Sequence, residues 1–185
     1  MKTSLTILLL YLPILLNAQS LKRILNRDQL DSVKNGFEII KIIDKTNCKS
    51  FFGLQGKIKI FRYNNKLDFN YIGDMESFFD NGNLKSQYVF DNNGLSKSYN
   101  EFTNNGEVIY DCTYEYKQIN GAIYRLEHLK LYYEPNKLMQ EGNRYMLYKK
   151  SNGGKHNSKQ RKYGKWTYYT PEGIVEKTKD YGKIK

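Results

Sequence analysis

A seven-residue pattern returns four times along this chain and constrains its fold more than any other feature. Each copy has an aromatic start, a short polar turn that usually ends in Gly, and an aliphatic residue that opens the next segment. The copies are FFDNGNL (78–84), FTNNGEV (102–108), YYEPNKL (132–138) and YYTPEGI (168–174). A repeated unit of this kind must stack on its neighbours to bury its apolar side. The sequence therefore predicts a repeat array whose function lies in an extended surface.

The first 18 residues have the composition of a secretory signal peptide. Lys2 supplies a positive charge, an apolar stretch runs from Leu5 to Leu16, and Ala18 offers a small residue for cleavage. The apolar stretch is too short to span a bilayer comfortably. We therefore predict a mature chain without a transmembrane segment that is exported to the periplasm, to the cell envelope or outside the cell. An uncleaved anchor and a buried N-terminal helix are the alternatives.

Basic residues concentrate at the C-terminal end. The whole chain has 30 Lys and Arg against 19 Asp and Glu, a formal net charge of +11 at pH 7. Residues 146–185 hold eleven of these basic residues against three acids, a balance of +8. This asymmetry predicts attraction to an acidic partner, although Lys also protects open sheet edges and favours solubility. The candidate contacts for an anionic partner are Lys155, Lys159, Arg161, Lys162 and Lys165.

Two cysteines, Cys48 and Cys112, remain after the predicted cleavage. In an exported protein such a pair can form a disulfide, which would stabilise the fold by ~3–4 kcal/mol in the chain-entropy model. Nothing in the sequence fixes the distance between them. A Cys48–Cys112 bridge and two free thiols are therefore both open.

The chain divides by pattern into three parts. They are a signal peptide (1–18), an N-terminal part (19–55) and a repeat part (56–185). Asn-Gly dipeptides in the repeat part predict hairpin turns with positive φ. Residues 151–161 contain no apolar side chain, so we expect a polar loop inserted between repeats.

The N-terminal part has its own pattern. A loosely helical apolar spacing predicts one short helix from about Leu21 to Lys34, and Gly36 is suited to ending it. Ile-rich and alternating segments then predict strands over 37–44 and 56–63.

The last copy of the repeat is the most complete and reads YGKWTYYTPEGIVE from Tyr163 to Glu176. It resembles the unit of the MORN-repeat variant family (membrane occupation and recognition nexus), which includes bacterial antitoxin-like members. A second good copy starts at Gly73, whereas the two copies between them are weaker and one has Asn136 in place of Gly. The resemblance covers roughly residues 73–185. A general β-meander is the competing interpretation.

The resemblance implies a mainly β fold, an elongated, single-layer antiparallel sheet of repeated hairpins, to which the pattern of the N-terminal part adds one short helix. The chain contains 17 Tyr and 9 Phe, whose large apolar bodies suit such a sheet. We interpret the aromatic residues of the repeats as a structural spine rather than a binding platform. The spine residues are Phe79, Gly82, Phe102, Gly106, Tyr133, Trp166, Tyr169 and Gly173, and they are expected to share the core with Leu84, Val108, Leu138 and Ile174.

Residues that carry chemistry are few. His128 and His156 are the only histidines, and neither has the spacing of a nucleophile triad or a zinc motif. Carboxylates such as Glu115 and Glu127 would resemble a glycosidase pair if they faced one another across strands. We predict no catalytic residue, no metal and no cofactor.

Two classes of function fit this sequence best. The first is an exported, non-catalytic repeat scaffold that mediates protein or anionic-surface interaction at the bacterial envelope. The alternative is an immunity or antitoxin-like protein that neutralises a toxin by direct binding, and an enzyme acting on an envelope polymer is a third class. Nucleic acid is not the expected partner, because an exported protein rarely meets it. The sequence leaves the partner's identity and the oligomeric state open.

Overall fold

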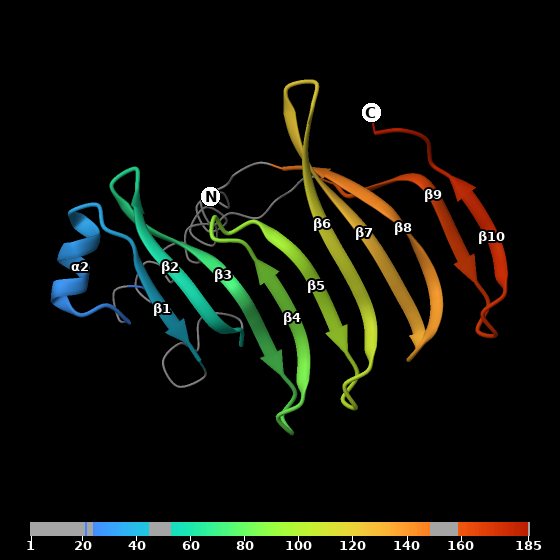
Figure 1. Ribbon diagram of the computed structural model, residues 1–185, viewed down its shortest axis with the longest axis horizontal. Coiled ribbons are helices and arrows are strands. Elements are labelled where there is room, and N and C mark those ends of the chain that lie inside the picture. Colours follow the sequence, from blue (N-terminus) through green and yellow to red (C-terminus); the bar gives the residue numbers. More distant parts are fainter. Residues whose placement is uncertain (1–20, 22–23, 45–52, 149–158, 185) are drawn as a thin grey trace, which may run out of the picture. The chain divides into compact units, whose positions relative to one another are not determined.

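The protein is mainly β, as the sequence predicts. Figure 1 shows the computed structural model, which describes residues 21, 24–44, 53–148 and 159–184. Ten strands form one open sheet in the order of the sequence, and their registers are antiparallel. The strands are β1 (Ile39–Ile43), β2 (Gln55–Tyr63), β3 (Lys66–Phe78), β4 (Leu84–Phe90), β5 (Ser96–Phe102), β6 (Val108–Ile119), β7 (Ala122–Glu134), β8 (Lys137–Leu147), β9 (Arg161–Tyr169) and β10 (Val175–Asp180).

The predicted turns with positive φ are confirmed. Gly82, Gly106 and Gly173 have φ of 89°, 84° and 84°. In the turn of Gly106 its N–H donates to the carbonyl of Thr103, and the N–H of Thr103 donates to the carbonyl of Glu107. This is a type I turn followed by a left-handed residue, which Gly adopts without steric cost. Asn136 has φ 63° and takes the same role where the repeat lacks Gly.

The predicted N-terminal helix is interrupted. Helix α2 (Arg27–Lys34) begins at Asn26, whose side chain accepts a hydrogen bond from the N–H of Gln29 while Gln29 reaches back to the N–H of Asn26. This reciprocal pair is a capping box, and it fixes the helix start. Leu21 and Ile24 are helical as well, so the prediction of a helix over 21–34 was wrong only in its continuity, which is broken at Leu25 and Asn26. Among the described residues, no helix is long and apolar enough to cross a membrane.

The chain forms two compact units. Residues 1–75 with 92–94 make up the first, and residues 76–91 with 95–185 make up the second. In the first unit α2 contacts β2, and Val33 of the helix is fully buried. Leu21 and Leu25 are buried as well, and the strands of this unit contribute Ile43, Ile58, Ile60, Ile72 and Met75.

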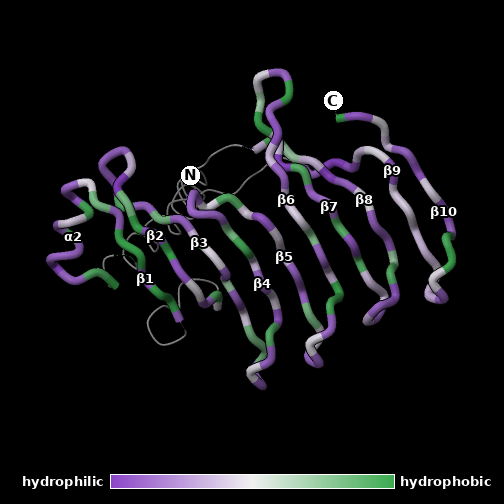
Figure 2. Tube along the Cα trace, viewed as in Figure 1, coloured by the Kyte–Doolittle hydropathy of each residue, from purple (hydrophilic) through white to green (hydrophobic). Residues whose placement is uncertain are grey.

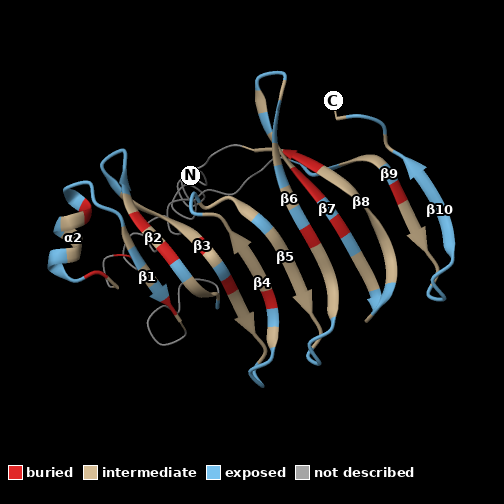
Figure 3. Cartoon of the chain, viewed as in Figure 1, coloured by how far each residue is buried: buried red, intermediate tan, exposed pale blue. Residues whose placement is uncertain are grey.

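The core of the second unit differs from the predicted spine. Trp166 is 1% exposed, as expected, and Cys112 and Leu129 are buried with it. Tyr133 and Ile174, however, are 45% and 66% exposed, so their assignment to the core was wrong. Buried positions lie within the strands, near the end of β8 and closer to the middle of β6, β7 and β9, whereas the turns are exposed (Figure 3). The other predicted spine side chains, Phe79, Phe102 and Tyr169, are half-buried with Leu84, Val108 and Leu138.

Candidate functional site

The side chain of Trp166 occupies space that a glycine leaves open. Cys112 lies opposite Leu129 on the neighbouring strand, and Leu129 lies opposite Gly142. A Cβ at position 142 would lie 2.3 Å from Trp166 Cδ2. The indole Nε1–H donates to the carbonyl of Asn143 at 2.8 Å. We call the side of β6–β10 that carries Trp166, Leu129 and Cys112 the aromatic face, and the other side the polar face.

A bulge at Gly164 brings the end of the chain onto the aromatic face. Gly164 has φ 60°, its N–H donates to the carbonyl of Gly182 at 2.7 Å, and its carbonyl accepts from the N–H of Tyr181 at 3.0 Å. The ring centroids of Tyr181 and Trp166 are 6.3 Å apart, and the Tyr181 and Tyr168 hydroxyls are 3.0 Å apart. The glycine of the Tyr-Gly-Lys-Trp motif therefore shapes a cluster of three aromatic rings.

Three lysines are held against these rings. The ammonium of Lys162 lies 3.9 Å from the Trp166 centroid and donates to the Tyr168 hydroxyl at 2.9 Å. Lys177 lies 4.9 Å from the Tyr168 centroid, and Lys179 lies 4.8 Å from the Tyr181 centroid. Cation–π contacts of this length are attractive and hold long side chains in place. None of the three ammonium groups has a carboxylate within salt-bridge distance among the residues the structure describes.

The two faces of β6–β10 differ in charge. Side chains of residues paired across strands share a face, so the registers assign each charge to one side. Among the charges that the registers assign, the aromatic face has five basic side chains and one carboxylate, a formal charge of +4, whereas the polar face has four of each and a formal charge of zero. The first set is Arg125, Arg144, Lys162, Lys177, Lys179 and Glu127; the second is Lys117, Lys130, Arg161, Lys165, Asp111, Glu115, Glu141 and Asp180. Glu134 and Lys137 form an ion pair with each other at a turn, and Glu176 lies in the register shift of β10, so these three are not counted.

The single carboxylate of the aromatic face is buried in an ion cluster. The side chain of Glu127 is 2% exposed and lies 2.7 Å from Arg125 and 2.9 Å from Arg144. Gln160 donates to Glu127 at 3.1 Å, and Arg144 donates to the Tyr110 hydroxyl at 2.7 Å. Two guanidinium groups share one carboxylate, so this cluster also retains a positive charge of one unit.

Burial suppresses ionisation beside this cluster. Burial raises the pKa of the Cys112 thiol to about 11, and the nearby Glu127 charge adds to the shift. Burial also raises the pKa of Tyr110 to about 12, with Cys112 contributing. Both groups are neutral at pH 7, and a thiol must be ionised to act as a nucleophile. The positive charge of the aromatic face is therefore not offset by these groups.

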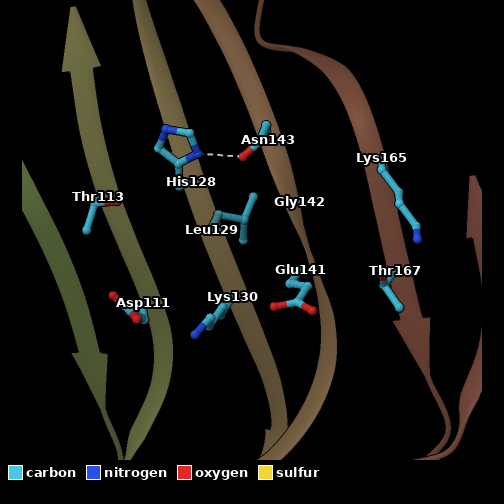
Figure 4. Close-up of a pocket in the computed structure, with 10 residues that line it drawn as sticks. All are labelled: Asp111, Thr113, His128, Leu129, Lys130, Glu141, Gly142, Asn143, Lys165 and Thr167. Carbon is cyan, nitrogen blue, oxygen red and sulfur yellow. Dashed lines mark hydrogen bonds between the residues drawn. The ribbon is translucent and has the colours of Figure 1, made fainter. Parts of the chain in front are cut away.

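The polar face contains a groove of about 460 Å³, shown in Figure 4. Its walls include His128, Asn143, Glu141 and Lys165 from three neighbouring strands. His128 Nδ1 lies 2.6 Å from Asn143 Oδ1, and because an amide oxygen only accepts, Nδ1 carries the hydrogen. His128 Nε2 is 3.9 Å from Glu115. The groove combines balanced charges with no Ser or Cys among its lining residues.

The structure separates the predicted basic contacts. Lys162 is on the aromatic face, whereas Arg161 and Lys165 are on the polar face. Lys165 lies opposite Asp180 in the register of β9 and β10. Lys159 is exposed just before β9. Lys155, His156 and Cys48 lie outside the described residues, so the proposed disulfide is not tested; Cys112 itself is fully buried.

Sequence reasoning missed most of the charges that surround Trp166. Lys177 and Lys179 alternate in the segment EKTKD, a signal that would place both on one face of a strand. Which face that is depends on register, and so do the positions of Arg125 and Arg144.

The carboxylates of Glu115 and Glu127 do not face one another. Tyr114, not Glu115, lies opposite Glu127, so Glu115 and Glu127 are on different faces of the sheet. Across the described residues, no three His, Cys, Asp or Glu side chains come together as a group that could hold a metal ion.

Comparison with known proteins gave no relatives. No family model, no curated protein and no solved structure matches this chain.

Proposed function

We propose that this protein is an exported, non-catalytic repeat scaffold of the bacterial cell envelope that binds an acidic protein through the aromatic face of β6–β10. The observation that carries the proposal is the difference in formal charge between the two faces, +4 against zero. A surface with uncompensated charge attracts a complementary partner and accelerates encounter with it. The polar face, with balanced charge, has no such bias.

The arrangement of the lysines supports binding over simple solubility. Lys162, Lys177 and Lys179 are held over aromatic rings at 3.9 to 4.9 Å instead of extending freely into water. Their positions are therefore ordered before a partner arrives, which lowers the entropy cost of binding. Solubility requires charge but no fixed position for it.

An acidic protein suits this face better than a lipid surface does. Membrane-interface aromatics lie with their rings in the headgroup region, and that requires exposed rings. Trp166 is 1% exposed, and lysine ammonium groups lie over the rings of Tyr168 and Tyr181. The face offers cations in fixed positions rather than an apolar group for insertion.

Export and repeat type are parts of the same proposal. Export rests on the apolar segment and small residues of positions 1–18, which lie outside the described residues. The assignment to MORN-type repeats rests on the unit at 163–176, in which Gly164 forms a bulge and Trp166 is buried.

Two charge-matched triple variants test the proposed function. One replaces Lys162, Lys177 and Lys179 by Gln, and the other replaces Lys130, Arg161 and Lys165 by Gln. Affinity for soluble polyglutamate, measured by titration calorimetry in about 0.15 M salt, should fall by at least about tenfold for the first variant and by less than about twofold for the second. Equal losses would show that only net charge matters and would contradict the proposal.

A second binding experiment, with lipid vesicles, distinguishes an anionic lipid surface from an acidic protein as the partner. Vesicles of phosphatidylglycerol and phosphatidylcholine should bind the two triple variants alike, because lipid attraction follows overall charge. Loss of vesicle binding in the first variant alone, with polyglutamate binding unchanged, would make the aromatic face a lipid-binding surface and overturn the assignment of a protein partner.

A further inference from the structure

We propose that the acidic partner binds as an additional β-strand along the free edge of β10. This inference rests on the proposed function and adds a mode of recognition to it: the partner segment is extended, pairs with the β10 backbone and has acidic side chains at alternate positions. Addition of a strand to an exposed edge is a general mode of peptide recognition, in which backbone bonds give affinity and alternate side chains give specificity.

Strand β10 has the geometry that strand addition needs. It is the last strand in the sheet order and is hydrogen-bonded to β9 alone within the described part of the chain. All six of its residues are exposed, and Figure 3 shows the strand exposed along its length. The outer edge of such a strand carries backbone N–H and C=O groups available for pairing.

The lysines of β10 do not block this edge. Edge lysines commonly prevent strand addition because their long side chains and charges surround the free backbone groups. Here the ammonium groups of Lys177 and Lys179 lie over the rings of Tyr168 and Tyr181, both on the aromatic face. The charges are therefore displaced from the plane of the sheet, in which a new strand would lie.

Charge alternation along β10 defines the side chains of the partner. Lys177 and Lys179 are on the aromatic face, whereas Thr178 and Asp180 are on the polar face. Cross-strand neighbours of opposite charge are favourable and like charges are unfavourable. A partner strand with acids on the aromatic side and neutral residues on the polar side is thus complementary. A partner strand with its acids on the polar side would place an acid beside Asp180.

The start of β10 offers an apolar contact at one end of the strand. Val175 is 54% exposed and Ile174, just before it, is 66% exposed. Figure 2 shows this hydrophobic start followed by a hydrophilic strand. An apolar residue near one end of the partner segment would bury these two side chains. The charge pattern and this apolar contact would together fix the register of the partner strand against β10.

Backbone methylation of a peptide tests strand addition directly. The probe is a short peptide that alternates Glu with Thr and ends in Val, and its matched control is N-methylated at two consecutive residues so that both of its edges lose a donor. We expect the methylated peptide to bind the protein at least about tenfold more weakly at equal charge. Amide groups of β10 should gain protection from hydrogen exchange only with the unmethylated peptide.

Charge-reversal variants assign the binding edge. Lys177→Glu with Lys179→Glu should abolish binding of the peptide, whereas Arg161→Glu with Lys165→Glu, an equal change on the polar face, should leave it within about twofold. Equal binding of the methylated peptide, or unchanged exchange in β10, would overturn strand addition. If polyglutamate still distinguishes the two Gln variants in that case, the acidic-partner function stands and only the strand mode fails; if polyglutamate does not distinguish them, the proposed function fails as well.

Discussion

Gly142 lies directly against the indole of Trp166, so close that a Cβ at position 142 would be 2.3 Å from the ring. The contact joins β8 to β9 at the centre of the aromatic face. We predict that Gly142→Ala destabilises the protein by about 1–3 kcal/mol, because the added methyl forces the indole out of its position. Urea unfolding followed by fluorescence of Trp166, the single tryptophan, measures this cost.

A double-mutant cycle isolates the contact. In a Trp166→Leu background the same Gly142→Ala substitution should cost much less, since the smaller side chain leaves room for the methyl. Circular dichroism replaces fluorescence as the readout in that background. Equal costs in both backgrounds would mean that Gly142 is required by its backbone and not by the indole.

Alkaline pH should destabilise the fold. The pKa of Cys112 is raised from 9.0 to about 11 and that of Tyr110 from 10.0 to about 12. Between its unfolded-state and folded-state pKa, each group binds more protons in the folded state than in the unfolded state. The stability that these groups contribute is therefore fully present below about pH 9 and decreases as pH rises. Urea midpoints should therefore fall progressively from about pH 9 to pH 12.

Cys112→Ala is the control for the alkaline decrease. The substitution removes the thiol, so the decrease between about pH 9 and pH 11 should become shallower, while the part due to tyrosines with a raised pKa, such as Tyr110 and Tyr114, persists. An unchanged pH slope in this variant would show that Cys112 ionises equally in the folded and unfolded states.

The left-handed turn residue can be tested by comparing two substitutions at one site. Gly106 has φ 84°, and a Cβ there would meet no heavy atom within 4 Å, so backbone conformation alone decides the outcome. Gly106→Val should cost more than about 1 kcal/mol, and Gly106→Asn should cost clearly less, because Asn tolerates this conformation. Asn64, Asn120 and Asn136 adopt it in the protein. Thermal unfolding that ranks Val and Asn equally would contradict the turn assignment.

The turns were predictable because their chemistry is local. A glycine such as Gly82 or Gly173 adopts positive φ irrespective of distant contacts, and the apolar alternation around it defines the flanking strands. The burial of Trp166 was predictable because its repeat motif is also a local sequence pattern. The start of α2 is also a readable signal, since Asn26 is followed three residues later by Gln29, the pattern of a capping box.

The distribution of charge over the two faces was not predictable, because it depends on register. Arg161 and Lys162 are neighbours in sequence and lie on opposite faces, and the pairing of β9 with β8 decides which face each one takes. A shift of one residue would move each charge to the other side of the sheet. Tyr133 and Ile174 are exposed for another reason. Both lie where strands end, and neighbouring strands no longer cover their side chains there.

A variant with transposed charges tests the central claim most directly. Lys162, Lys177 and Lys179 are replaced by Gln on the aromatic face, and Thr113, Thr167 and Thr178 are replaced by Lys on the polar face, so net charge is unchanged. Titration calorimetry with polyglutamate should show at least about a tenfold loss of affinity, because the charge has left the face with ordered lysines. Affinity within about twofold of the unmodified protein would contradict the claim that the aromatic face, and not total charge, binds the acidic partner.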